Sequence, residues 1–132
     1  MKGPKKKAWS AFSQYIRLRD CIETTGTSTH FICCTCKKTL PYEMSQAGHA
    51  IGGRNNSILL HPELVHAQCA GCNAFGGQYA AYSIYMIDKY GLEHWRELEF
   101  LSRKGSPMKE WQWKEAAEMW KSKFEGLRSL GL

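Results

Sequence analysis

The 132-residue sequence has no run approaching the roughly 18 consecutive apolar residues that a membrane-spanning helix needs, so we expect no membrane partner. Acidic residues are also scarce, with 12 Asp and Glu against 18 Lys and Arg, which gives a formal net charge of +6. This excess favours an anionic polymer as partner, although lysines that only solvate the surface give the same balance. Residues 24–77 lack long apolar periodicity and are rich in Gly, Ser, Thr and Asn, so they need a staple besides a hydrophobic core.

The N-terminus lacks the apolar stretch that marks a signal peptide. Residues 1–7 are basic and are followed by an amphipathic segment, so we expect a cytoplasmic protein with reduced thiols. In that compartment, paired cysteines bind metal more often than they form disulfides. We interpret residues 1–7 as a flexible basic arm on which Lys5, Lys6 and Lys7 contact nucleic acid.

Four of the six cysteines form two Cys-x-x-Cys pairs, Cys33 with Cys36 and Cys69 with Cys72. Each pair turns tightly enough to present two sulfurs, so the four thiolates can close a tetrahedral zinc site at the base of one loop. Cys34 could compete with Cys33 as a ligand, but only Cys33 gives the two-residue gap to Cys36. The sequence therefore predicts a structural zinc ion that staples the middle of the chain.

Apolar residues recur at helical spacing in several segments, and the predicted helices cover residues 8–23, 73–90, 92–101 and about 107–127. Ser106 and Pro107 have the chemistry of a helix start, and they introduce the last of these helices. The aromatic side chains of that helix follow the helical period, which favours packing over base stacking. Cys21 is expected in the core beneath the first helix.

Short strands are expected around the cysteine pairs, at residues 31–33, 40–44, 58–60 and 64–68, with a Gly- and Asn-rich loop at residues 46–57. Because no internal repeat is visible, residues 8–132 are expected to form a single domain. Its parts are a helix at 8–23, a zinc-bound core at 31–90 and C-terminal helices at 92–127. The predicted fold class is α+β.

Polar residues near the glycine-rich loop suggest phosphodiester chemistry. Hydrolysis of a phosphodiester requires a base to activate water, and His49 lies between the two cysteine pairs, next to this loop. Arg54 in the loop and Gln46 before it are candidates for positioning the phosphate, since a guanidinium matches two phosphate oxygens at once. Arg17 on the first helix adds a further candidate contact with nucleic acid.

Asn73 follows Cys72 immediately, so a zinc ion would fix the backbone of a residue whose amide oxygen can hold a hard cation. Mg²⁺ suits such a site because it keeps most of its waters and needs few protein ligands. An Asn at the start of a helix is also a common cap. Ligation and capping therefore both stay open for Asn73.

The order Cys-x-x-Cys, Gly48-His49, Cys-x-x-Cys-Asn73 resembles that of HNH nucleases of the ββα-metal class. A further resemblance, to the NinG/Rap family of lambdoid phage recombination proteins, covers about residues 8–101. It rests on AFSQYIRLRD at 11–20, QAGH at 46–49, VHAQC at 65–69, CN at 72–73 and YG at 90–91. This resemblance implies a DNA endonuclease, active in the host cytoplasm, that is selective for branched recombination intermediates such as Holliday junctions, D-loops or flaps.

The HNH resemblance also implies a fold and a set of roles. The fold would be a small zinc-stapled ββα-metal core with flanking N-terminal and C-terminal helices. The four paired cysteines would hold the structural zinc, His49 would be the general base, and Asn73 would bind a catalytic Mg²⁺ or Mn²⁺. The products would carry 5′-phosphate and 3′-hydroxyl ends.

One position departs from the pattern of many HNH nucleases, which have an Asp before the base as a second metal ligand where this chain has Gly48. Another class of ββα-metal nucleases has Gly there and relies on one Asn and waters. His66 has three interpretations: it supplies the missing ligand, it orients His49, or it is a structural histidine.

The sequence is also compatible with a second class of function, DNA binding without catalysis. The chain could be a non-catalytic, zinc-stabilised module that binds branched or single-stranded DNA. This alternative is motivated by Gly48 and by Leu64, which stands where HNH proteins commonly have an Asn. If a four-way junction is cut symmetrically, a homodimer is expected, and the Trp-rich C-terminal helix is the candidate interface.

Overall fold

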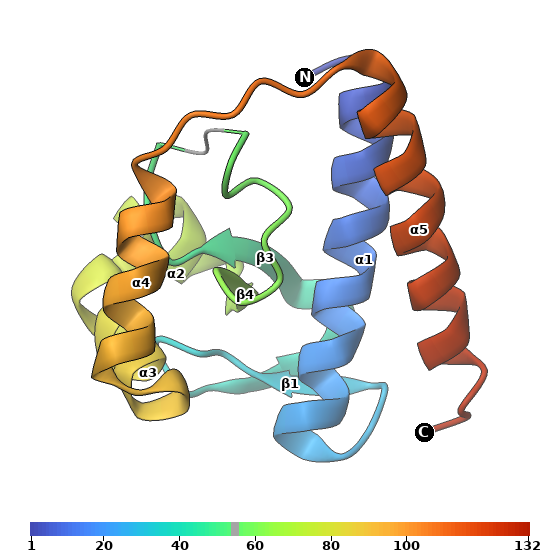
Figure 1. Cartoon of the computed structure of the whole chain (residues 1–132). Coiled ribbons are helices and arrows are strands. Elements are labelled where there is room, and N and C mark those ends of the chain that lie inside the picture. Colours follow the sequence, from blue (N-terminus) through green and yellow to red (C-terminus); the bar gives the residue numbers. More distant parts are fainter. Residues whose placement is uncertain (54–55) are drawn as a thin grey trace.

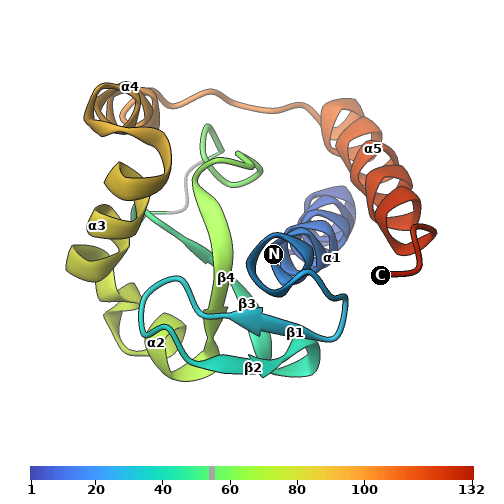
Figure 2. The same cartoon turned by 90° about the horizontal axis from the view of Figure 1, so that it is seen from below.

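The computed structural model describes residues 1–53 and 56–132 and has a mixed α+β architecture, with helices on either side of two small antiparallel ladders (Figures 1 and 2). Along the chain, the elements are α1 (Gly3–Thr25), β1 (His30–Ile32), β2 (Thr39–Pro41), η1 (Tyr42–Met44), β3 (Ser45–His49), β4 (Val65–Cys69), α2 (Ala70–Ala74), η2 (Gly76–Gln78), α3 (Tyr79–Tyr90), α4 (Leu92–Ser102) and α5 (Glu110–Arg128).

The ladder of β3 and β4 positions the candidate site. The two strands are antiparallel, with Gly48 opposite His66 and His49 opposite Val65. Because side chains alternate between the faces of a strand and paired residues share a face, His49 and His66 point to opposite faces of the ladder. The smaller ladder pairs β1 with β2. The strand expected at 58–60 is wrong, since these residues form turns.

Helices α1 and α5 lie side by side and run in the same direction (Figure 1). The Trp120 ring meets Phe12 edge-on at a centroid distance of 4.8 Å, and the Lys5 ammonium lies 5.5 Å from the centre of the Trp113 ring. Both contacts join residues that are equally far along their helices, as a parallel pair requires. The prediction that the aromatic stripe of the last helix packs is confirmed, because Trp113 and Trp120 are buried.

Helix α1 begins earlier than expected. It starts at Gly3 with Pro4 in its first turn, where the missing N–H of proline costs nothing. The lysines that were expected on a flexible arm at residues 1–7 therefore stand on the first turns of a helix. Helix α5 begins later than Ser106 and Pro107 indicated, because Lys109 is its cap and its N–H donates to the Gln112 side chain at 2.8 Å.

The helix expected at residues 73–90 is broken into α2, η2 and α3. Three successive residues have positive φ, 75° at Gly76, 70° at Gly77 and 55° at Gln78, and a right-handed helix cannot pass through this conformation. The regular helix resumes at Tyr79 and ends at Gly91, as predicted. Because of this break, α2 has a different direction from α3 and packs on β3 and β4.

The apolar core has parts on both sides of the β3–β4 ladder. On one side, α3 and α4 bury Tyr82, Met86, Trp95 and Leu98. On the other side, the α1–α5 pair packs through Phe12, Ile16 and Trp120 against Ala47 and Val65. Cys21 is buried, as expected, and packs with Phe31, Cys33 and Ala67 beneath the cysteine pairs. Among the described residues, no helix is both long and apolar enough to cross a membrane.

Candidate metal centre and active site

The two Cys-x-x-Cys pairs meet where the turn between β1 and β2 approaches the end of β4. The Sγ atoms of Cys33, Cys36, Cys69 and Cys72 all lie within 4.8 Å of one another, and those of Cys36 and Cys69 are 3.8 Å apart. A tetrahedral site with Zn–S bonds of about 2.3 Å separates its sulfurs by about 3.8 Å. The cluster can therefore hold a structural metal ion such as zinc.

Geometry selects Cys33 over Cys34 as the member of the first pair. Burial opposes ionisation of Cys33, but hydrogen bonds from the Cys36 backbone, from Thr35 and from the Cys69 backbone lower the pKa of its thiol to about 6. Its Sγ lies in the cluster with those of Cys36, Cys69 and Cys72. The Cys34 side chain instead lies in the core under α3, and burial raises its pKa well above the usual range.

Local turns of the backbone present each pair of sulfurs. Lys37 has a left-handed φ of 65°, and its N–H donates to the carbonyl of Cys33 at 2.9 Å. At the second pair, Cys69 is the N-cap of α2, and its Sγ accepts a hydrogen bond from the Cys72 N–H at 3.4 Å. The capping alternative for Asn73 is therefore wrong, because Cys69 caps this helix and Asn73 lies inside it.

Asn73 turns its amide oxygen toward the residue before His49. Its Nδ2 donates to the side-chain oxygen of Gln46 at 2.8 Å, so the opposite atom, Oδ1, faces Gly48. A Cβ built on Gly48 would lie 3.0 Å from this oxygen. The cysteine cluster and the β3–β4 ladder thus place the amide oxygen of the half-buried Asn73 beside the end of the strand that carries His49.

Gly48 is enclosed by polar groups. Its carbonyl accepts a hydrogen bond from the Tyr82 hydroxyl at 2.6 Å. On its other side lies the Oε1 atom of Gln68, which is buried and is the single buried side-chain polar atom without a hydrogen-bond partner among the described residues. An unsatisfied buried polar atom costs about 1–3 kcal/mol. Such an atom calls for a physical explanation.

His49 lies at the C-terminal end of β3, on the face of the ladder that α1 covers. Its ring stacks on Trp9 of α1 with a centroid distance of 5.3 Å and an angle of 19°, and its Nε2 lies 3.2 Å from the carbonyl oxygen of Leu59. A carbonyl can only accept, so Nε2 carries the proton in the neutral ring and the lone pair is on Nδ1. The residue is 7% exposed.

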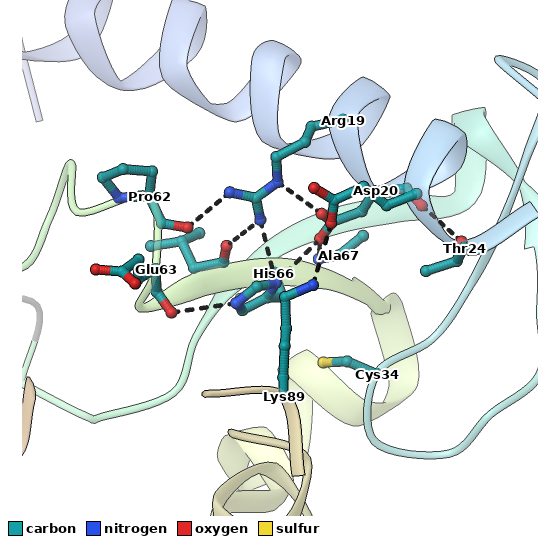
Figure 3. A network of polar contacts seen from close by, with 12 residues as sticks. Arg19, Asp20, Thr24, Cys34, Pro62, Glu63, His66, Ala67 and Lys89 are labelled. Atoms are coloured by element: carbon teal, nitrogen blue, oxygen red, sulfur yellow. Dashed lines mark hydrogen bonds and ion pairs between the residues drawn. The ribbon is translucent and has the colours of Figure 1, made fainter. Parts of the chain in front are cut away.

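His66 is buried on the opposite face, in a polar network (Figure 3). Its Nδ1 lies 3.1 Å from the guanidinium of Arg19 and 3.5 Å from the carboxylate of Asp20. Its Nε2 lies 3.1 Å both from the carbonyl of Glu63 and from the hydroxyl of Tyr90. The structure therefore does not bring His66 to His49, and these contacts support the structural interpretation of His66.

The network joins α1 to β4. The Arg19 guanidinium also donates to the carbonyls of Pro62 and Val65, at 2.7 and 2.9 Å, and the Asp20 carboxylate accepts from the N–H of Ala67 at 2.7 Å. Burial opposes ionisation of Asp20, but the contacts with His66 and Arg19 lower its pKa from 3.8 to about 2. The network thereby fixes the position of α1, which also carries Trp9, relative to the ladder.

The residues expected to contact nucleic acid are spread over two surfaces. Lys6 and Lys7 are exposed on the first turns of α1, whereas Lys5 is partly covered by Trp113. Arg17 is held by the Ser45 hydroxyl at 2.9 Å and lies over the Tyr42 ring, so it also ties α1 to β3.

The other two candidates of this kind are Arg54 and Gln46. Arg54, expected to position the phosphate, lies outside the described residues. Gln46 is exposed on β3, and its oxygen holds the amide of Asn73. Its position therefore supports a role in orienting Asn73.

Sequence reasoning missed two residues of this site. Gln68 was expected only as part of a strand, and the single signal for it is that it lies two residues after His66 and so shares the face of Gly48. Trp9 was expected as core of the first helix, and no local pattern in the sequence pairs it with His49. Both relations depend on contacts between distant segments.

The class defined by this structure is a small α+β protein with four cysteine sulfurs close enough to hold one structural metal ion. A family model described as bacteriophage lambda NinG protein matches residues 2–130, so the chain belongs to the NinG family. The family expected from the motifs is thereby confirmed. No curated protein and no solved structure matches the chain.

Proposed function

We propose that this protein is a metal-dependent DNA endonuclease of the HNH, or ββα-metal, class that hydrolyses phosphodiester bonds in branched recombination intermediates. The observation that carries the proposal is the position of Asn73. Its amide oxygen faces Gly48, and the next residue along β3 is His49. A cation ligand and a base are thus supported on one frame, next to a cysteine cluster that can hold zinc.

In this proposal, zinc is a scaffold and takes no part in the chemistry. All four positions around it are thiolates, so no position is open for water or substrate. The ion would fix the end of β4 and the first turn of α2, and Asn73 directly follows the ligand Cys72. Zinc binding therefore orients Asn73 through the backbone.

The tautomer of His49 supports its role as general base. With the Nε2 proton donated to the carbonyl of Leu59, Nδ1 accepts a proton from water. As that proton moves to Nδ1, the water oxygen bonds to phosphorus and the bond from phosphorus to the 3′ oxygen breaks. Solvent then protonates the 3′ oxygen, which leaves a 5′-phosphate and a 3′-hydroxyl.

The residues around Asn73 fit a hard divalent cation, Mg²⁺ or Mn²⁺. Amide oxygens suit such ions, and Asn73 donates through Nδ2 to Gln46 while its Oδ1 faces Gly48. The ion would stabilise the negative charge that develops on the leaving oxygen. The chain contributes the ligand, and waters complete the coordination.

Charge supports DNA as the partner. The net charge of +6 and the exposed ammonium groups of Lys6 and Lys7 favour contact with a phosphate backbone. Membership of the NinG family, with its phage origin, supports a recombination substrate. Branched DNA fits both features, because it carries a phosphate backbone and is an intermediate of recombination.

The proposal is tested with flap, three-way, four-way and D-loop substrates and zinc-loaded protein in Mg²⁺ or Mn²⁺. We expect cleavage of at least one branched substrate, and a loss of about 10²–10⁴-fold in rate for His49→Ala with DNA binding retained. His61→Ala is the matched control, because this histidine is partly exposed on the segment after the loop and should leave the rate unchanged. Wild-type protein that leaves every substrate intact would refute the proposal.

A non-catalytic DNA-binding module is the second candidate. The observation in its favour is the low exposure of His49, 7%, beneath Trp9. A binding module needs no accessible base. It predicts that His49→Ala binds branched DNA as the wild type does and that neither protein cleaves it, whereas the endonuclease predicts cleavage that only the wild type performs.

A further inference from the structure

The unpartnered oxygen of Gln68 has a fixed orientation. The Gln68 Nε2 donates to the carbonyl of Gly77 at 3.0 Å and to the hydroxyl of Thr35 at 3.1 Å. Because a carbonyl only accepts, the carboxamide cannot be reversed, and Oε1 must face away from Gly77. It faces Gly48, and it has no hydrogen-bond partner among the residues that the structure describes.

This oxygen stands where the side chain of residue 48 would be. A Cβ on Gly48 would lie 1.9 Å from Gln68 Oε1 and 3.0 Å from Asn73 Oδ1. The φ of Gly48 is not in the left-handed region that favours glycine, so space rather than backbone conformation excludes a side chain here. Gln68 and Gly48 are therefore complementary, since the amide of one fills the volume that the other leaves.

Two amide oxygens, Gln68 Oε1 and Asn73 Oδ1, thus lie beside Gly48 near the end of β3. Each is 3.0 Å or less from the point where that Cβ would stand, so the two oxygens are neighbours. Both are uncharged, hard donors of the kind that Mg²⁺ and Mn²⁺ bind. The fold brings these residues together, because α2 packs on β3 and β4, and Gly77 in the break after α2 accepts a hydrogen bond from Gln68 of β4.

We propose that Gln68 Oε1 is the second protein ligand of the catalytic cation, beside Asn73 Oδ1. It replaces the residue-48 side chain that this protein lacks, and it explains why a buried amide oxygen is left without a hydrogen bond. The inference rests on the proposed function, because it concerns the cation of that reaction. The competing explanation is purely structural: Gln68 pins β4 to the turn before α3, and its oxygen meets only the Cα–H of Gly48.

The test measures cation binding without DNA or catalysis. Zinc-loaded protein is titrated with Mn²⁺, and its affinity is read from the paramagnetic broadening of the amide signals of residues 48 and 73, which also reports weak binding. We expect Gln68→Ala to lower the Mn²⁺ affinity on the order of tenfold. Zinc content and the unfolding midpoint, measured in parallel, verify that each variant is folded.

A compensating variant sharpens the test. Gly48→Asp alone places its Cβ against Gln68 Oε1 and should disturb the ladder. In Gly48→Asp with Gln68→Ala, the carboxylate enters the vacated volume and should restore Mn²⁺ affinity to at least the wild-type value. Gln14→Ala is the matched control, because it makes the same side-chain change at an exposed position of α1, and it should bind Mn²⁺ as the wild type does.

Three results would overturn the assignment of Gln68 and leave the proposed function standing. They are an unchanged affinity in Gln68→Ala beside a loss in Asn73→Ala, an equal loss in Gln68→Ala and Gln14→Ala, and a double variant that binds no better than Gln68→Ala. Failure of the proposed function itself is recognised separately, by wild-type protein that neither shows Mn²⁺ broadening at these amides nor cleaves branched DNA.

Discussion

We expect Cys36→Ala to destabilise the protein more than Cys34→Ala, although Cys36 is exposed and Cys34 is buried. Burial alone predicts the opposite order. Cys36 makes little contact with the core, so without a metal Cys36→Ala would change stability by no more than about 0.5 kcal/mol. Cys34 packs in the core with Tyr82, and Cys34→Ala would cost about 1 kcal/mol for the lost sulfur and the small cavity.

A metal in the cluster reverses this order. Structural zinc contributes on the order of 10 kcal/mol to small domains, which is comparable to the whole stability of about 5–15 kcal/mol of a domain. The smaller ladder has three residue pairs and depends on this support. Losing one of four thiolates should therefore lower the free energy of unfolding by at least about 3 kcal/mol in Cys36→Ala, several times the cost of Cys34→Ala.

The assay is urea unfolding with equimolar zinc, followed by far-ultraviolet circular dichroism, together with quantification of bound zinc. We expect one zinc per chain in the wild type and in Cys34→Ala, and less than one in Cys36→Ala. Adding a chelator should reduce the wild type to the stability of Cys36→Ala. If Cys36→Ala is as stable as the wild type, or less affected than Cys34→Ala, the reasoning about the metal centre is wrong.

Further predictions concern stability and DNA binding. The pKa of Asp20, lowered from 3.8 to about 2, means that its stabilisation is complete above pH 3.8 and is lost only as the pH falls toward 2. Urea unfolding of Asp20→Asn should therefore show a loss of about 2 kcal/mol that is constant from pH 5 to 8, and a loss that varies across this range would contradict the assignment. Trp120→Ala should cost about 3–5 kcal/mol and speed amide exchange in α5, because the ring packs between α1 and α5; unchanged exchange would contradict this. Neutralising Lys6 and Lys7 to Gln should reduce the salt slope of DNA binding by about 2, and an unchanged slope would exclude them as phosphate contacts.

Local sequence carried the prediction of the metal cluster and of most helices. The gap between Cys33 and Cys36, and that between Cys69 and Cys72, constrain a turn so strongly that the sulfurs can be paired without the fold. The apolar periodicity of residues 92–101 and the glycine at position 91 located α4 and the end of α3, because helical packing and chain termination depend on neighbours in sequence.

Where expectations were wrong, a particular backbone or tertiary contact overrode the pattern. The apolar period across residues 73–90 continues through Gly76 and Gly77, but their positive φ breaks the helix. Most of the arm expected at residues 1–7 is helical, since α1 begins at Gly3. Contact of Lys5 with Trp113 of α5 favours this earlier start of the helix. Neither the break at residues 76–77 nor the early start of α1 can be predicted from apolar periodicity alone.

By itself, the sequence identified the candidate residues from spacing and residue type: the paired cysteines for a structural metal, and His49 and Asn73 for the proposed base and cation ligand. Only the tertiary structure decided how they face one another. The register of β3 against β4 sends His49 and His66 to opposite faces, and a shift of one residue would exchange them. The Gln68 oxygen reaches Gly48 only because strand pairing and the turn after α2 bring distant segments together, and no local pattern encodes such a contact.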